Sequence, residues 1–173
     1  MNRQDIQLKD FHYDVARLRD HWFALFAGDF NARVFNAMTI SWGSYGHVWD
    51  KMVFQVMVRP SRYTYDFMNR YDSFTLNAFT PEYKQALSIL GSNSGRNLDK
   101  IALAGLTPMA SRKVDAPSFE EAQLVIECRK IYWHDLNEAN FLDSDIEEHY
   151  PRKDYHRIYL GEIVNVSQQI IKP

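Results

Sequence analysis

The residues best suited to hold a ligand lie where a predicted strand gives way to a helix. The segment Arg59-Pro60-Ser61-Arg62-Tyr63-Thr64 places two guanidinium groups and two hydroxyls directly before that helix. Arginine offers phosphate a rigid fork of donors, and the free N–H groups at a helix start also favour an anion. The segment therefore predicts phosphate binding, although a surface loop with a helix cap would use the same residue types.

A second segment repeats this combination. Ser94-Gly95-Arg96 brings together a hydroxyl, a glycine and a cation before a predicted helix, and Lys100 lies one turn into that helix. Gly95 would let the main chain approach an anion closely. A third and weaker segment, Thr39-Ile40-Ser41-Trp42-Gly43, ends a predicted strand, where backbone groups become free to face a ligand. The first two segments together favour a small phosphorylated ligand.

Missing motifs exclude several classes of enzyme. The sequence has no Gly-x-Gly-x-x-Gly, and Gly91-Ser92-Asn93-Ser94-Gly95-Arg96 lacks the spacing of a Walker loop. His-Glu-x-x-His and Gly-x-Ser-x-Gly are also absent, and the six histidines are scattered, so no metal site is predicted. Cys128 lies within a predicted strand and is expected to be a small buried hydrophobe. The acidic residues 135–148 are expected to form a solvated loop and helix face.

Length and charge narrow the class further. A chain of 173 residues has the size of one domain. Its 20 Lys and Arg against 22 Asp and Glu give a net charge of −2, which disfavours binding to nucleic acid. A single cysteine excludes an intrachain disulfide and fits the cytoplasm. No apolar stretch predicts a signal peptide or a membrane span, so we expect a cytoplasmic protein with neither a nucleic-acid nor a membrane partner.

The elements that must position these segments are mostly predicted strands. Strands are expected over residues 22–28, 33–42, 52–58, 73–79, 122–133 and 157–166. Three short helices are expected: one capped by Ser61 or Thr64, one from Thr80-Pro81 to a stop at Gly91, and one from Asn97 or Asp99 to about Gly105. Because strands and helices do not alternate regularly, the pattern predicts a mainly β, mostly antiparallel barrel with inserted helices.

The aromatic residues divide into two groups. Most are predicted to fill the core, among them Phe23, Phe26, Phe54, Phe74 and Tyr132. Strand alternation would place Tyr132 on the same face as Cys128. Trp42, Tyr63 and Phe79 instead lie in or beside the segments that could hold a ligand.

Together these segments resemble the flavin reductase family, whose members have an FMN-binding split β-barrel fold. The resemblance rests on the order and spacing of blocks along nearly the whole chain: Asn36-Ala37-Met38-Thr39-Ile40-Ser41-Trp42-Gly43, Val58-Arg59-Pro60-Ser61-Arg62-Tyr63-Thr64-Tyr65, Phe74-Thr75-Leu76-Asn77, Ser94-Gly95-Arg96-Asn97-Leu98-Asp99-Lys100, Ala104-Gly105-Leu106-Thr107-Pro108 and Asp154-Tyr155-His156-Arg157-Ile158-Tyr159-Leu160-Gly161-Glu162-Ile163. It implies that residues 1–173 form one such domain, which pairs as a homodimer with FMN near the interface.

The resemblance also implies which residues contact the cofactor FMN. The isoalloxazine and ribityl chain would face Thr39, Ile40, Ser41 and Trp42, and the ring would lie near Asn77, Ala78 and Phe79. The phosphate would be held by Arg59, Ser61, Arg62 and Thr64, with Tyr63 beside them, and by Ser94, Gly95, Arg96 and Lys100. Many members carry Gly-Asp-His before the last strand, whereas this chain reads Lys153-Asp154-Tyr155-His156, and His156 is expected to contact the nicotinamide.

The implied activity is transfer of a hydride from NAD(P)H to flavin. The chemistry would belong to the cofactor, so no catalytic acid or base is predicted. Reduced flavin would then serve a partner monooxygenase or another electron acceptor. An alternative is an FMN-binding carrier or sensor without NAD(P)H turnover. A barrel that has lost its cofactor is disfavoured, because the cluster Arg59, Arg62 and Arg96 is hard to explain without an anion.

Overall fold

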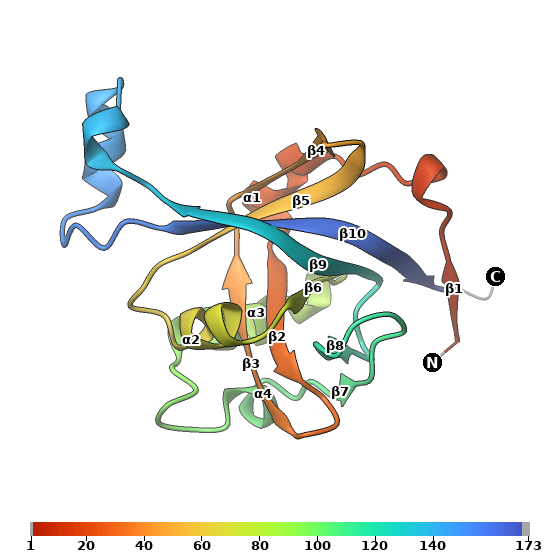
Figure 1. Ribbon diagram of the computed structural model, residues 1–173. Helices are drawn as coiled ribbons and strands as arrows, with labels where there is room; N and C mark the ends of the chain where they lie inside the picture. Colours follow the sequence, from red (N-terminus) through yellow and green to blue (C-terminus); the bar gives the residue numbers. More distant parts are fainter. Residues whose placement is uncertain (1, 171–173) are drawn as a thin grey trace.

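Antiparallel strands are the main regular structure of the protein, which is represented by a computed structural model that describes residues 2–170 (Figure 1). The strands are β1 (Arg3–Asp5), β2 (Phe23–Asp29), β3 (Val34–Ile40), β4 (Gly43–Val48), β5 (Lys51–Val58), β6 (Ser73–Ala78), β7 (Pro108–Met109), β8 (Ser118–Phe119), β9 (Leu124–Asp135) and β10 (Arg157–Gln169). The α-helices are α1 (Leu18–His21), α2 (Tyr63–Arg70), α3 (Lys84–Ser92) and α4 (Lys100–Leu103). Short 3-10 helices are η1 (Leu8–Asp10), η2 (Val15–Arg17), η3 (Pro81–Tyr83), η4 (Glu138–Asn140) and η5 (Ser144–His149).

The two longest strands join two halves of one sheet. The order is β3-β2-β6-β9-β10-β5-β4, with β1 added to β10, and every pairing is antiparallel. Strand β6 pairs with the first half of β9, whereas β5 pairs with the first half of β10. Two register irregularities interrupt the β9–β10 ladder, and such bulges bend and twist a sheet. The predicted mainly β, antiparallel architecture with inserted helices is confirmed.

Buried aromatic side chains fill the core as predicted, with one exception. Phe23, Phe26, Phe54 and Phe74 are fully buried. Tyr132, which was expected to join them, is 48% exposed. The ladder pairs Leu160 with Tyr132 but Gly161 with Lys130, so one extra residue of β9 turns Tyr132 to the face opposite Cys128. Alternation read from the sequence could not show this bulge.

Gly161 is needed where β10 crosses the core. A Cβ at this position would lie 2.6 Å from the Phe74 ring and 2.8 Å from the Cβ of Cys128. Cys128 is fully buried, as predicted, and burial raises the pKa of its thiol well above the ordinary value. The thiol therefore packs as a small apolar group.

The helix boundaries differ from the sequence predictions at two ends. Neither Ser61 nor Thr64 caps α2, which begins at Tyr63 after Arg62 without a side-chain cap. Helix α3 continues through Gly91 to Ser92 rather than stopping at the glycine. Asp99 caps α4 by accepting from the backbone N–H groups of Ile101 and Ala102. Of the two possible starts that the sequence indicates, Asn97 and Asp99, the structure therefore uses Asp99.

Four strands were not predicted. Strands β7 and β8 have only two residues each, and β1 has three, which is too short for a periodic pattern. Strand β4 was missed because its sequence, Gly-Ser-Tyr-Gly-His-Val, contains two glycines, which are uncommon in strands. Its partner β5 supplies the pairing that the sequence of β4 does not favour by itself.

Candidate functional site

A small cavity joins two of the segments that the sequence singled out. It has a volume of about 100 Å³ and lies where the start of α2 meets the chain between α3 and α4. Its walls are Met38, Ser61, Arg62, Tyr63, Thr64, Ser92, Asn93, Ser94 and Lys100. Residues about thirty positions apart in the sequence thus present hydroxyls and two cations to one space, which has the size and chemistry of a phosphate group.

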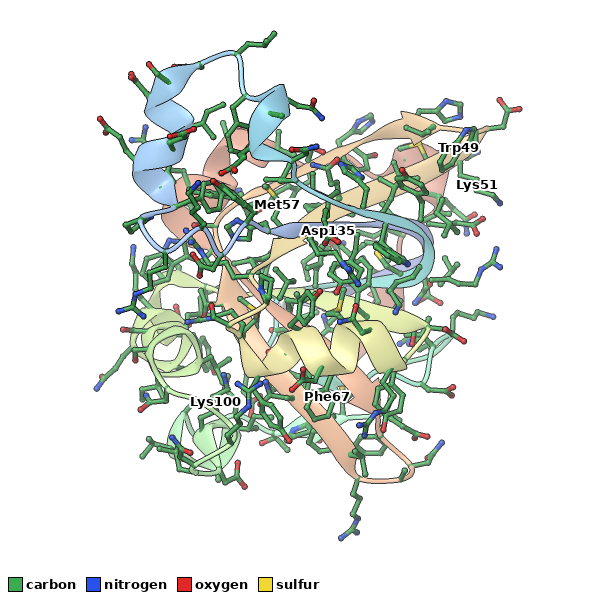
Figure 2. All side chains as sticks on the ribbon, turned by 60° about the vertical axis from the view of Figure 1, so that its left-hand side comes forward. Trp49, Lys51, Met57, Phe67, Lys100 and Asp135 are labelled. Carbon is green, nitrogen blue, oxygen red and sulfur yellow. The ribbon has the colours of Figure 1, made fainter. Side chains whose placement is uncertain are left out.

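Lys100 is the most deeply buried cation of this cavity. Only 3% of the residue is exposed, and its Nζ donates to the carbonyl oxygens of Leu90 at 2.9 Å and Asn93 at 3.1 Å. Burial, followed by the charge of Arg62, lowers the pKa of Lys100 to about 8. Lys100 lies in the lower part of the view in Figure 2, to the left of Phe67 of α2.

Arg62 supplies the second cation and is partly buried. Its Nη2 donates to the carbonyl oxygen of Gly91 at 2.5 Å, at the end of α3. Burial and the charge of Arg59 lower its pKa. Within residues 2–170, no carboxylate forms an ion pair with Arg62 or with Lys100. The pair therefore carries positive charge that the described part of the chain does not neutralise locally.

Asn36 ties the two segments together, a role that sequence reasoning missed. It is 3% exposed, and its Nδ2 donates to the hydroxyl of Thr64 at 2.7 Å. A Cβ on Gly95 would lie 2.2 Å from Asn36 Oδ1 and 3.1 Å from the Tyr63 ring. Gly95 therefore leaves room for the Asn36 amide. The sequence had instead predicted that it leaves room for an anion. The sequence did offer one signal for this role, because Asn36 is an amide within the largely apolar strand β3.

The three arginines grouped by the sequence are separated in the structure. Arg59 pairs with Asp154 at 2.7 Å, and the hydroxyl of Ser61 donates to the same carboxylate at 3.0 Å. Arg96 pairs with Asp66 at 2.9 Å and lies over the ring of Tyr63. Arg62 is thus the one arginine of the three that lines the small cavity.

The segment from Thr39 to Trp42 reaches a wider, open groove. Ser41 and Trp42 line it together with Met57 and with Val15, Ala16, Leu18, Arg19 and Asp20, around a volume of about 680 Å³. Ile40 is buried, and the hydroxyl of Thr39 donates to the carbonyl oxygen of Leu87 at 2.5 Å. Ser41 and Trp42 are therefore the members of this segment that face the groove.

His156 packs against Trp42, which lines this groove. The two ring centroids are 5.4 Å apart, and Nδ1 of the histidine lies 2.7 Å from the hydroxyl of Tyr150. Burial, followed by the charge of Arg59, lowers the pKa of His156 to about 4, so the imidazole is neutral near pH 7. Tyr150 was not singled out in the sequence, since it belongs to the excursion that stands away from the sheet between β9 and β10 (Figure 1).

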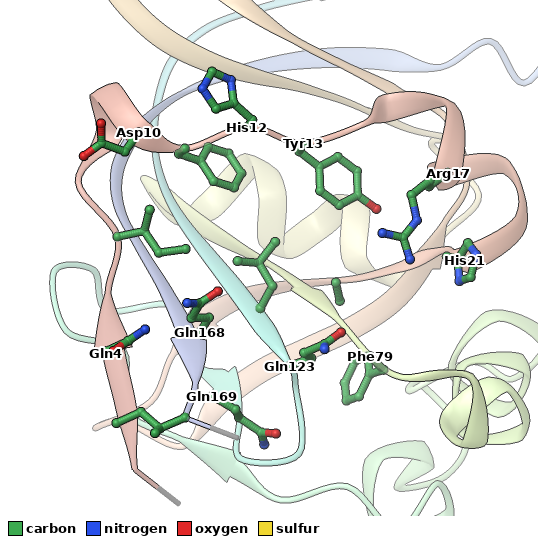
Figure 3. A pocket seen from close by; sticks show the side chains of 15 residues that line it. Gln4, Asp10, His12, Tyr13, Arg17, His21, Phe79, Gln123, Gln168 and Gln169 are labelled. Carbon is green, nitrogen blue, oxygen red and sulfur yellow. The ribbon is translucent and has the colours of Figure 1, made fainter. Parts of the chain in front are cut away.

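The remaining predicted residues lie elsewhere. Asn77 is fully buried, and its side chain bonds to Ala24, Thr75 and the N–H of Phe119. These bonds give Asn77 a role in holding the sheet. Ala78 and Phe79 line a third cavity, next to the N-terminal residues (Figure 3). The predicted flavin contacts that line a cavity are therefore divided among three cavities, and the others line none of the three.

The fold and a match to a protein-family model define the class of protein. Residues 26–170 match the model of the family described as flavin reductase like domain. This match covers well over half of the chain, so the protein belongs to the flavin reductase-like family. No helix within residues 2–170 is both long and apolar enough to cross a membrane.

Two solved structures are similar to this one. Flavoredoxin of Desulfovibrio vulgaris (Miyazaki F) has a similar structure, with a TM-score of 0.66 and 26% identity over 86% of this chain and 69% of its own. An FMN-binding domain of a flavin reductase-like enzyme from Shewanella baltica OS155 gives a TM-score of 0.69 and 15% identity, covering 96% and 77%.

A curated relative adds no named activity. It is an uncharacterised protein of Pyrococcus abyssi (strain GE5 / Orsay), 27% identical over 117 residues, which are 66% of this chain and 56% of that protein. The chain thus spans little more than half the length of this relative.

Proposed function

We propose that the protein binds FMN and transfers a hydride from NAD(P)H to the flavin. The observation that carries the proposal is the pair Arg62 and Lys100, two cations in one small cavity without a carboxylate partner among residues 2–170. Holding two buried like charges together is costly unless an anion joins them. The single cysteine favours the reducing cytoplasm as the place of action.

The donors of the cavity fit the phosphate of FMN. Arg62 and Lys100 would neutralise its charge, and the hydroxyls of Thr64 and Ser94 would donate hydrogen bonds. The hydroxyl of Thr64 already accepts from Asn36, which leaves its own hydrogen free to point at the ligand. When bound, FMN supplies a ring that accepts a hydride and passes electrons on.

Trp42 and His156 would form the wall beside the ring and the nicotinamide. The hydrogen bond to Tyr150 fixes the orientation of His156, and the neutral imidazole brings no positive charge to this wall. A neutral aromatic wall of this kind can pack against a flat ring. The role of these residues is therefore to orient the reactants and exclude water.

The first test is an anaerobic titration of the FMN-loaded protein. We expect NADH or NADPH to bleach the flavin absorbance, and we expect the protein to take up FMN stoichiometrically. Bound flavin that neither nucleotide reduces would contradict the proposed reaction. Failure to bind FMN at all would contradict the cofactor assignment.

An FMN-binding carrier or sensor without NAD(P)H turnover is the second candidate. Two observations favour it: the similarity to a protein named flavoredoxin, and the sequence Asp154-Tyr155-His156 before β10. Asp154 is occupied by Arg59 and Ser61, and Tyr155 bonds to Glu138. The same titration separates the candidates, because a carrier would hold FMN and ignore both nucleotides.

Two arginine variants test the phosphate site itself. Arg62→Gln should weaken FMN binding by about 1.5 to 3 kcal/mol, or roughly 10- to 150-fold, because a charged hydrogen bond to phosphate is lost. Arg96→Gln is the matched control, since Arg96 is exposed and pairs with Asp66 outside the cavity. The control should change the affinity less than threefold. Equal losses in both variants would remove Arg62 from the site.

We also propose a homodimer, formed through the outer face of the β4-β5-β10-β9 half of the sheet. Trp49, at the tip of the β4–β5 hairpin, is 62% exposed and packs edge-on against Tyr132. Beside Tyr132, the Nδ1 atom of His134 is buried without a hydrogen-bond partner among the described residues. Glu162 is neutralised by Lys51 and Arg129, so charge repulsion would not oppose a second copy.

A further inference from the structure

The largest of the cavities described here is walled on one side by residues that precede the family match. It has a volume of about 710 Å³, which suits a small-molecule ligand. One wall comes from the N-terminal residues between Gln4 and His21, and the other from the ends of β6, β9 and β10 (Figure 3). Because the family match begins at residue 26, this wall is not part of the matched domain. The cavity shares no lining residue with the small cavity at Lys100.

One end of the cavity gathers hydrogen-bond donors. The hydroxyl of Tyr13 points toward Arg17, and His21 lies next to the guanidinium (Figure 3). Burial raises the pKa of Tyr13, while the charge of Arg17 opposes this shift. The phenol therefore stays protonated and can donate near pH 7.

The guanidinium of Arg17 is uncommitted. No side-chain hydrogen bond or ion pair joins it to any other residue in the described part of the chain. Asp10, the acidic residue of the cavity lining, points away from Arg17 (Figure 3). A planar fork of donors beside a phenol hydroxyl matches a carboxylate, which accepts two parallel hydrogen bonds.

Part of the cavity lining is apolar and aromatic, and amide side chains such as Gln4 and Gln168 contribute polar surface beside it. Phe11 and Phe79 are 4% and 5% exposed, and Ala78 and Leu124 complete the apolar surface. The amide of Gln123 lies in this surface beside Phe79 (Figure 3). Aromatic walls with a few polar groups are typical of sites for flat organic ligands.

We infer that this cavity binds a small carboxylic acid with a flat apolar body, its carboxylate held by Arg17 and Tyr13. Among residues 2–170, Arg17 is the one arginine or lysine that lines this cavity, which matches the single charge of a carboxylate, whereas the two cations suited to a phosphate, Arg62 and Lys100, line the other cavity. The inference does not depend on flavin binding, so its test can succeed or fail independently of the proposed function.

The test uses three naphthalene probes and isothermal titration calorimetry. We expect 2-naphthoate to bind roughly tenfold more tightly than 2-naphthalenemethanol, which lacks the charge, because a hydrogen bond to a charged group adds about that factor. We expect 2-naphthyl phosphate to bind no more tightly than the carboxylate. Saturating FMN should leave the affinity for 2-naphthoate unchanged.

Two variants test whether Arg17 causes the preference for 2-naphthoate over the alcohol. Arg17→Gln should remove the preference for 2-naphthoate over the alcohol, and it should fold because Arg17 is exposed. Lys9→Gln, a charge change on the same segment but outside the cavity lining, should keep the preference. The inference is overturned by equal affinities for acid and alcohol, by a preference that survives Arg17→Gln, by tighter binding of the phosphate, or by displacement of 2-naphthoate by FMN.

Discussion

Lys100 and Arg62 show how single residues create the candidate phosphate site. Each donates to backbone carbonyl oxygens, Lys100 to Leu90 and Asn93 and Arg62 to Gly91. These carbonyl groups lie at the C-terminal end of α3 or just after it, where a helix favours positive charge. The carbonyl groups hold both cations in place without neutralising them, which leaves their charge available to an anion.

The titration of Lys100 gives a prediction for the pH dependence of FMN binding. With a pKa of about 8 in the free protein, Lys100 is charged below this pH and loses its proton above it. FMN affinity should therefore be nearly constant from pH 6.5 to 7, fall to about half by pH 8, and then fall by up to about tenfold per pH unit. Fluorescence titrations of FMN at fixed ionic strength measure this profile.

The variant Lys100→Arg provides the control for that profile. Arginine keeps its proton throughout this range, so the affinity of the variant should no longer fall between pH 8 and 9.5. A wild-type affinity that stays constant up to pH 9.5 would show that Lys100 does not hold the phosphate.

At the scale of elements, two short helices set the positions of these residues. Helix α4 has only four residues and would not be stable alone. Its Asp99 cap fixes the first turn, and this places Lys100 beneath the end of α3. Gly91 allows close contact between α3 and β3, because a Cβ at this position would lie only 3.2 Å from the Cβ of Thr39. Helix α3 can therefore pack closely on β3.

Asp99→Ala should lower the free energy of unfolding by about 1 kcal/mol, because two backbone N–H groups lose their acceptor. It should also weaken FMN binding by loosening the turn that carries Lys100. Asn97→Ala is the matched control, because Asn97 makes no cap. Urea unfolding followed by circular dichroism measures the difference. Equal stability of the two variants would show that the cap does not anchor α4.

At the scale of the molecule, the outer face of the bent sheet exposes aromatic side chains, Trp49 and Tyr132 among them. Trp49 and Asp50 form the tip of its β4–β5 hairpin, with φ values of 53° and 55°. Such a conformation is unfavourable for tryptophan, and strain of this kind often marks a functional position. An exposed aromatic side chain held in this way suits the centre of an interface.

Trp49→Asn should separate the subunits of the proposed homodimer without destabilising each one. Asparagine tolerates a positive φ better than tryptophan does, so the hairpin should persist while the aromatic contact is lost. We expect the dissociation constant of the dimer to rise about tenfold or more, as measured by sedimentation velocity over a concentration series.

Leu142→Ser controls for the loss of an exposed apolar side chain, because Leu142 is fully exposed outside this face. The control should leave the dimer intact. A wild-type protein that sediments as a monomer at all concentrations would contradict the proposed dimer.

The sequence by itself determined the class of fold and the chemistry of the candidate site. Strand signals in the sequence predicted β2, β3, β5, β6, β9 and β10: alternation for β3 and β9, and apolar, β-branched or aromatic runs for strands such as β2 and β5. The residue types between 59 and 64 and between 94 and 100 predicted an anion site, because few other groups favour arginine, lysine and hydroxyls before a helix. The strand signals and the anion-site signals both come from residues that lie close together in the sequence.

Only the tertiary structure decided which of these residues share a cavity. In the folded protein Arg59 pairs with Asp154 and Arg96 pairs with Asp66, whereas Arg62 and Lys100 line the same cavity. The sequence could not predict this division, because the partners lie 95 and 30 positions away. The bulge that exposes Tyr132 also depends on the pairing of β9 with β10. Charge neutralisation and strand register are properties of contacts between distant segments, and these contacts exist only once the chain has folded.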